Sequence, residues 1–244
     1  MTTPHTLPEN GNVHVWCFEG TGLSSDLAQS LSETLSSDER LAIARFRDAR
    51  LREYRTAGRA MLRQVLSSYL RVPMATVVLG VGRHGKPLVV TPQAHCLQFN
   101  VSHSDAITLI AVANGQEVGI DVERVRGDLP IDTIAPASFS SAEWNTFRQA
   151  PEAEHVATFF PCWTRKEAVL KAEGVGLNRA LNSVEVGIGT LGEITRTDAL
   201  AVLSLDVAPG CAAAVAVEGK EIAATTYVWD PAEALTCFVN LPGL

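Results

Sequence analysis

Two stretches of the chain repeat apolar residues at the spacing of an amphipathic helix. In residues 51–70 they recur about every 3.6 positions. The pattern ends before Pro73, and a proline disfavours the helical conformation in the residue that precedes it. Residues 152–173 carry a second such stripe, which stops at a glycine typical of helix ends. Shorter helices are predicted over residues 36–46 and 140–151, because each starts with a serine N-cap and acidic residues in the first turn.

Alternating or continuous apolar runs between these helices predict strands. The predicted strands cover residues 13–18, 76–81, 87–90, 97–101, 107–113, 118–123, 184–188, 200–207, 211–217 and 225–229. Helix followed by strands occurs twice, which predicts an α+β fold of two similar halves with a ligand cleft between them. We expect the halves to be residues 1–114 and 115–229, followed by a tail over residues 230–244.

The strand at residues 118–123 carries two acids on one face. Its alternation puts three aliphatic side chains on one side and Gly119, Asp121 and Glu123 on the other. Residues two apart on a strand lie roughly 6.5 Å apart, so the two carboxylates can lean onto one hard cation, without which they would repel each other. Gly119 leaves room beside them for a ligand or another backbone.

The second long helix carries residues that could complete this site. Trp163, Glu167 and Lys171 are spaced four apart and share one side of the helix. Glu167 can supply a third carboxylate to the cation, and Lys171 can reach an anionic group bound there. The alternative is an ordinary surface ion pair between Glu167 and Lys171, which contributes little to stability.

Two short segments offer donors suited to phosphate. The turn Gly85-Lys86-Pro87 exposes backbone amides and one ammonium group. Ser102 and His103 stand at the end of a predicted strand and offer small hydrogen-bond donors. Each segment is also common where no ligand binds, as a plain turn or a structural strand end.

Charge is distributed unevenly along the chain. The net charge is −7, but residues 40–71 contain nine arginines against two acids, a local charge of +7. This segment could attract polyanions or could simply be a solvated helix face. The five cysteines lack paired spacing and no apolar run approaches a membrane span. We therefore expect a cytoplasmic protein without a membrane or nucleic-acid partner.

Taken together and in order, four motifs resemble the Sfp-type 4'-phosphopantetheinyl transferases. They are Gly-Lys-Pro at residues 85–87, Phe-Asn-Val-Ser-His-Ser at 99–104, Val-Gly-Ile-Asp-Val-Glu at 118–123 and Trp-Thr-Arg-Lys-Glu-Ala-Val-Leu-Lys-Ala-Glu-Gly at 163–174. The resemblance implies two halves related by a pseudo-twofold. It also implies transfer of phosphopantetheine from coenzyme A to a serine of an apo acyl or peptidyl carrier protein, with release of 3',5'-ADP.

The resemblance also implies roles for individual residues. Asp121, Glu123 and Glu167 would bind Mg²⁺, and Lys171 would stabilise or protonate the departing phosphate. Glu167, or a magnesium-bound water, is the candidate base for the carrier serine. The residues implied in coenzyme A binding are Arg40 and Arg55 for the 3'-phosphate, Arg83, His84, Gly85, Lys86 and Pro87 on the adenine side, Ser102 and His103 for phosphate, and Asp121, Glu167 and Lys171 at the diphosphate.

Two other function classes are compatible with part of this pattern. A binding protein could dock coenzyme A or an acidic carrier without transfer, although it would need neither Lys171 nor three acids. A magnesium-dependent phosphohydrolase would need a water-activating site that the sequence does not indicate. We expect a monomer, because an internal pseudo-repeat can build the cleft, and an acidic carrier protein as partner. Fatty-acid, polyketide and peptide carriers are equally compatible.

Overall fold

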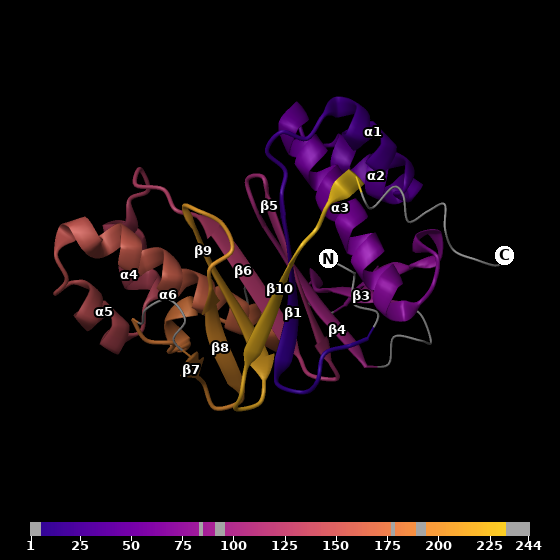
Figure 1. The fold of residues 1–244 in the computed structure, drawn as a ribbon. Helices are drawn as coiled ribbons and strands as arrows, with labels where there is room; N and C mark the ends of the chain where they lie inside the picture. The colour runs from indigo at the N-terminus through magenta and orange to yellow at the C-terminus, as the bar shows by residue number, and fades with distance from the viewer. Residues whose placement is uncertain (1–5, 83–84, 91–95, 177–178, 189–193, 233–244) are drawn as a thin grey trace.

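The computed structural model describes residues 6–82, 85–90, 96–176, 179–188 and 194–232. Helices gather on two sides of the molecule with the strands between them (Figure 1). The helices are α1 (Ser25–Glu33), α2 (Ser37–Ala44), α3 (Ala49–Leu70), α4 (Ile131–Ser138), α5 (Ser141–Phe147) and α6 (Glu152–Glu173), with 3-10 turns η1 (Met74–Thr76) and η5 (Leu181–Ser183). The strands are β1 (Asn12–Glu19), β2 (Leu79–Val81), β3 (Pro87–Val89), β4 (Leu97–Ser104), β5 (Ile107–Asn114), β6 (Val118–Arg124), β7 (Ile194–Arg196), β8 (Leu200–Leu205), β9 (Cys211–Glu218) and β10 (Ala223–Val228).

Two four-stranded sheets form the centre of the molecule. Their strand orders are β10-β1-β5-β4 and β6-β9-β8-β7, while β2 and β3 form a separate hairpin. The α3 helix packs on the first sheet and α6 on the second. A third apolar cluster lies between the sheets and includes Val15 of β1, Leu109 of β5 and Ile120 of β6. The layers are therefore helix, sheet, sheet and helix, and the expected α+β fold is confirmed.

The last strand, β10, pairs with the first strand. It runs parallel to β1, from Asn12 opposite Ala223 to Cys17 opposite Val228. Tyr227 of β10 stacks on Trp16 of β1 with ring centroids 4.8 Å apart. Residues 223–228 therefore extend the sheet of the first half, although they fall in the range 115–229 expected for the second. The physical reason is that β1 offers backbone groups at the edge of the sheet that β10 can pair.

Several elements depart from the sequence-based expectations. Helix α1 was not expected, although Ser24 caps it by accepting a hydrogen bond from the amide of Leu27. Helix α4 forms despite Pro136 inside it. The strand predicted over residues 184–188 is wrong, because the amides of Val186 and Gly187 bond the carboxylate of Glu143 instead of a neighbouring strand. No helix among the described residues is both long and apolar enough to span a membrane.

Candidate active site

The centre of the site is a contact between β6 and α6. The ammonium of Lys171 lies 2.6 Å from Oδ1 of Asp121. The hydroxyl of Ser102 on β4 donates to the same oxygen at 3.0 Å, and Lys171 donates to the Ser102 oxygen at 3.0 Å. Asp121 is only 4 % exposed, and its buried Oδ2 has no hydrogen-bond partner among the described residues. One carboxylate oxygen is therefore saturated while the other is available for a further partner.

Gly119 allows α6 to lie directly on β6. A Cβ atom at this position would sit 2.1 Å from the carbonyl oxygen of Ala168 and 2.3 Å from the amide nitrogen of Ala172. Because both are backbone atoms of α6, a larger residue would force the helix away from the strand. The sequence-based expectation that Gly119 leaves room for another backbone is confirmed, and the close packing carries Lys171 to Asp121.

The acidic residues expected at the site line one cavity. It has a volume of about 460 Å³ and is lined by Arg55, Val101, Ser102, His103, Asp121, Glu123, Trp163, Glu167 and Lys171. Burial raises the pKa of Asp121. Burial, followed by the negative charge of Asp121, also raises the pKa values of Glu123 and Glu167. The three carboxylates therefore stand in an environment that favours a bound cation.

The donor set suits a hard divalent cation. All three acids offer only oxygen, as Mg²⁺ requires, and the unpartnered Oδ2 of Asp121 provides a ligand atom. Within the described part of the chain, however, no three His, Cys, Asp or Glu side chains converge closely enough to ligate one ion. Ligation by Asp121, Glu123 and Glu167 together therefore requires at least one of these side chains to rotate.

A larger cavity adjoins the acidic one. It has a volume of about 860 Å³, lies between α2, α3 and the β2–β3 hairpin, and shares Arg55, Val101 and His103 with the smaller cavity. Nδ1 of His103 lies 2.9 Å from the hydroxyl oxygen of Thr108. Burial, together with the charges of Arg55, Lys171 and Arg59, lowers the pKa of His103 to about 3, so its ring is neutral at pH 7. Burial also lowers the pKa of Arg55.

Some of the expected coenzyme A contacts lie elsewhere. The guanidinium of Arg40 donates to the backbone carbonyls of Ser32 and Leu35, and Arg40 is not among the residues lining either cavity. The ammonium of Lys86 lies 2.7 Å from Glu117, at the junction of the two halves, whereas Gly85 and Pro87 do line the larger cavity. Arg83 and His84 lie outside the described residues.

Two arginines of α3 that the sequence analysis did not single out line the larger cavity. They are Arg59 and Arg63, and the signal that could have found them is their place four and eight residues after Arg55, on the same side of the helix. Arg63 is buried and bonds Glu39 at 2.8 Å and the carbonyl of Met74 at 2.8 Å. Its contacts are structural. Arg59 also lies 3.5 Å from Glu39, but its side chain is 36 % exposed, so Arg55 and Arg59 are the arginines that can reach a ligand.

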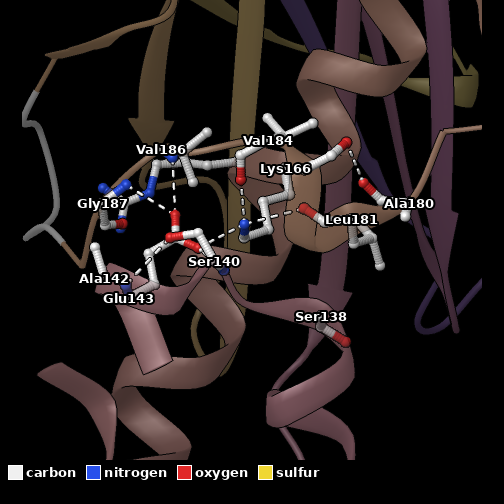
Figure 2. A network of polar contacts seen from close by, with 12 residues as sticks. Ser138, Ser140, Ala142, Glu143, Lys166, Ala180, Leu181, Val184, Val186 and Gly187 are labelled. Atoms are coloured by element: carbon white, nitrogen blue, oxygen red, sulfur yellow. Dashed lines mark hydrogen bonds and ion pairs between the residues drawn. The ribbon is translucent and has the colours of Figure 1, made fainter. Parts of the chain in front are cut away.

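The lysine of the Trp-x-x-Lys-Glu motif, Lys166, points away from both cavities. It is fully buried, its ammonium lies 2.5 Å from Oε2 of Glu143, and it donates to the carbonyl of Leu181 at 3.1 Å and to that of Val184 (Figure 2). Glu143 accepts from the amide of Val186 at 2.8 Å. Burial acts to raise the pKa of Glu143, but the hydrogen bonds from Lys166 and the amides lower it on balance.

Comparison with known proteins identifies the family. The 4'-phosphopantetheinyl transferase superfamily model matches residues 117–218, and the model of the N-terminal part of 4'-phosphopantetheinyl transferases matches residues 24–115. The 4'-phosphopantetheinyl transferase HetI of Nostoc sp. is 35% identical over 231 residues, which cover 93% of this chain and 94% of HetI. The chain belongs to the 4'-phosphopantetheinyl transferase superfamily.

Other relatives are consistent with this family. The 4'-phosphopantetheinyl transferase psf-1 of Bacillus pumilus is 33% identical over 68% of this chain and 70% of its own length. The rat L-aminoadipate-semialdehyde dehydrogenase-phosphopantetheinyl transferase is 30% identical over 72% of this chain and 60% of its own length. The resemblance noted from the motifs is confirmed: this 4'-phosphopantetheinyl transferase moves phosphopantetheine from coenzyme A to a carrier protein.

Proposed function

We propose that the transfer takes place in the acidic cavity, and that it joins phosphopantetheine to a serine hydroxyl of an apo acyl or peptidyl carrier protein and releases 3',5'-ADP. The supporting observation is that Asp121, Glu123, Glu167 and Lys171 line one cavity with Arg55. Phosphoryl transfer needs mainly positioning and charge neutralisation around an in-line displacement. This group of side chains can provide both.

Asp121, Glu123 and Glu167 would hold Mg²⁺. When bound, the cation would neutralise charge on the diphosphate of coenzyme A. The raised pKa values of the three acids and the unpartnered Oδ2 of Asp121 support this role. Ser102 would hold Asp121 in place through its hydrogen bond to Oδ1.

Lys171 and Glu167 would handle protons and charge during transfer. The ammonium of Lys171 is held by Asp121 and Ser102, and it can donate a hydrogen bond to the departing 3',5'-ADP phosphate. Glu167 is half-buried and lines the same cavity, where its carboxylate can act as a general base. It would accept the proton of the carrier serine as the serine oxygen bonds to phosphorus.

The larger cavity would bind the nucleotide end of coenzyme A. Its volume of about 860 Å³ lies within the usual range for ligand sites. Arg55 and Arg59 supply positive charge, and the neutral His103 can act as a hydrogen-bond donor or acceptor. Arg55 and Arg59 would therefore contact the phosphate of the nucleotide, in place of the Arg40 and Arg55 that the motifs suggested.

The carrier partner is proposed to be acidic at its docking face. The local charge of +7 over residues 40–71 supports such a partner, because opposite charges speed association. We further propose that the enzyme is a cytoplasmic monomer. Two sheets contributed by one chain already enclose the site, so a second copy is not needed to complete it.

Mass spectrometry of an apo carrier tests this function directly. The carrier is incubated with the enzyme, coenzyme A and Mg²⁺, and a mass gain of one phosphopantetheinyl group is expected. A carrier with alanine at its acceptor serine is the matched control and should gain nothing. The Lys171→Ala and Glu167→Gln enzymes should lose most activity, and near-wild-type turnover in both would overturn the residue assignment.

The same experiment separates the other function classes. Coenzyme A binding without modification of several carriers would indicate a binding protein. Cleavage of coenzyme A with no carrier modified would indicate a phosphohydrolase. Chelation of divalent cations tests the metal, because transfer should stop and should resume when Mg²⁺ is added back.

A further inference from the structure

The two sheets are joined at the active site by side chains of one strand. β4 and β6 are edge strands of different sheets. Three alternate residues of β4 accept hydrogen bonds from three alternate backbone amides of β6. The pairs are Asn100 Oδ1 with Ile120 N at 3.0 Å, Ser102 Oγ with Val122 N at 3.3 Å and Ser104 Oγ with Arg124 N at 2.9 Å. Side chains thus take the place of the backbone carbonyls that a neighbouring strand would offer.

The two serines of this row also reach the acidic residues of β6. The Ser102 hydroxyl donates to Asp121 Oδ1, and the Ser104 hydroxyl donates to Glu123 Oε2, both at 3.0 Å. A hydroxyl group has one donor and two acceptor sites. Because the amide of Arg124 occupies one acceptor site of Ser104, the hydroxyl is fixed in place and its single hydrogen points to the carboxylate of Glu123.

Ser104 has fewer contacts at the site than Ser102, so its effect on the site is easier to interpret. Ser102 lines the acidic cavity and contacts Lys171, so its loss would disturb several groups at once. Ser104 is not among the residues that line this cavity, and its contacts at the site run through Glu123 and the backbone of β6. An effect of Ser104 on catalysis would therefore have to pass through Glu123 or through the strand.

We propose that Ser104 is a positioning residue that holds Glu123 in the orientation needed to bind the divalent cation. The inference rests on the proposed metal-binding role of the acidic cavity. Glutamate has a long side chain with several rotamers, and a fixed hydroxyl selects among them. Partners that orient metal ligands typically change metal affinity by about 10–100-fold when they are removed. Ser104 would orient Glu123, the less buried of the two acids of β6, and Ser102 would orient Asp121 in the same way.

A double-mutant cycle between Ser104 and Glu123 tests the proposal. Mn²⁺ binding to the full-length enzyme, followed by electron paramagnetic resonance, is measured for the wild type, Ser104→Ala, Glu123→Ala and the double variant. We expect Ser104→Ala to weaken Mn²⁺ binding about tenfold in the wild-type background. In the Glu123→Ala background the same change should alter binding by less than about twofold, because its target is gone.

Two further variants separate positioning from structure. Ser104→Thr retains the hydroxyl and should recover Mn²⁺ binding close to the wild type. Ser30→Ala removes an exposed hydroxyl that donates to the carbonyl of Asp26 on α1, and it should change nothing. The Mg²⁺ concentration for half-maximal transfer should rise with Ser104→Ala in the same proportion as the Mn²⁺ dissociation constant. If Ser104→Ala does not fold, Ser104→Cys, which keeps the volume and weakens the donor, replaces it in the cycle.

Equal losses of Mn²⁺ affinity in both backgrounds would overturn the proposal, because Ser104 would then act through the strand alone. Unchanged Mn²⁺ binding in Ser104→Ala would overturn it as well. Failure of the proposed function looks different, since the wild-type enzyme itself would then neither bind Mn²⁺ nor need Mg²⁺ for transfer.

Discussion

The ammonium of Lys171 lies 2.6 Å from Oδ1 of Asp121 and ties the last turns of α6 to the middle of β6. Asp121 is held on one oxygen by Lys171 and Ser102. Glu123 is half-buried, and among the residues that the structure describes its carboxylate accepts a side-chain hydrogen bond from Ser104 alone. The two acids of β6 therefore differ in how firmly they are placed. Asp121 is the one around which the cavity is organised.

This difference predicts which of two substitutions reduces the rate of carrier modification more. Asp121→Ala should reduce the rate of carrier modification by at least about a hundredfold, because it removes a cation ligand and the carboxylate that positions Lys171. Glu123→Ala should reduce this rate about tenfold, since the other two acids remain. Both rates are measured by mass spectrometry of the carrier. The reverse order would show that Glu123 is the principal ligand.

Gly119 provides a test of the packing between α6 and β6. Gly119→Ala would place a Cβ atom 2.1 Å from the carbonyl oxygen of Ala168, so α6 must shift and carry Lys171 away from Asp121. We expect a loss of roughly 1–3 kcal/mol in the free energy of unfolding and a larger loss of transfer activity than stability alone explains. Urea unfolding and transfer assays on the same preparation measure both. Gly127→Ala is the matched control, because a Cβ atom there meets no atom of the described residues within 4 Å.

The residues of the site differ in how well the sequence alone could place them. Asp121, Glu123, Glu167 and Lys171 were predicted to meet because strand alternation and helical spacing fix which face each side chain occupies. Arg40 bonds backbone carbonyls of its own neighbourhood instead of lining either cavity, because a long side chain can turn in a direction that spacing does not fix. The pairing of β10 with β1 could not be predicted, because periodicity identifies a strand without indicating its partner. The buried role of Lys166 depends on the segment 181–187, which periodicity had assigned partly to a strand.

Lys166 should be essential for stability. Lys166→Met would leave Glu143 as a buried carboxylate without its cation, which typically costs about 3–5 kcal/mol in the free energy of unfolding. Thermal and urea unfolding measure the loss. Adding Glu143→Gln should recover part of it, because the charge disappears while an oxygen can still accept from the amide of Val186.

Arg179→Met is the control for the effect of Lys166. It breaks an ion pair of similar length, 2.6 Å to Glu173, but in a solvent-exposed position. Exposed pairs of this kind contribute about 0–1 kcal/mol. An equally small effect of Lys166→Met would contradict the assignment of Lys166 as a buried structural lysine.

His103 predicts a specific pH dependence of stability. Its pKa is about 3 in the folded protein, whereas the ordinary histidine value is 6.5. Between these pH values the unfolded chain binds a proton that the folded protein does not, so the contribution of His103 falls as the pH drops below 6.5. The free energy of unfolding of the wild type should therefore fall more steeply than that of His103→Asn between pH 7 and roughly pH 4. Parallel pH profiles in urea unfolding would show that His103 titrates normally.

Arg55 should be the main arginine for binding the phosphates of coenzyme A. It lines both cavities, and its buried Nε has no hydrogen-bond partner among the described residues, so an incoming anion can satisfy it. Arg55→Gln should weaken coenzyme A binding about tenfold or more, the usual effect of losing a hydrogen bond between charged groups. Isothermal titration calorimetry measures the change.

Arg50→Gln on the exposed part of the same helix removes an equal charge outside both cavities and should bind coenzyme A within about twofold of the wild type. Equal losses in the two variants would mean that the whole basic segment attracts coenzyme A by its net charge, without a specific contact from Arg55.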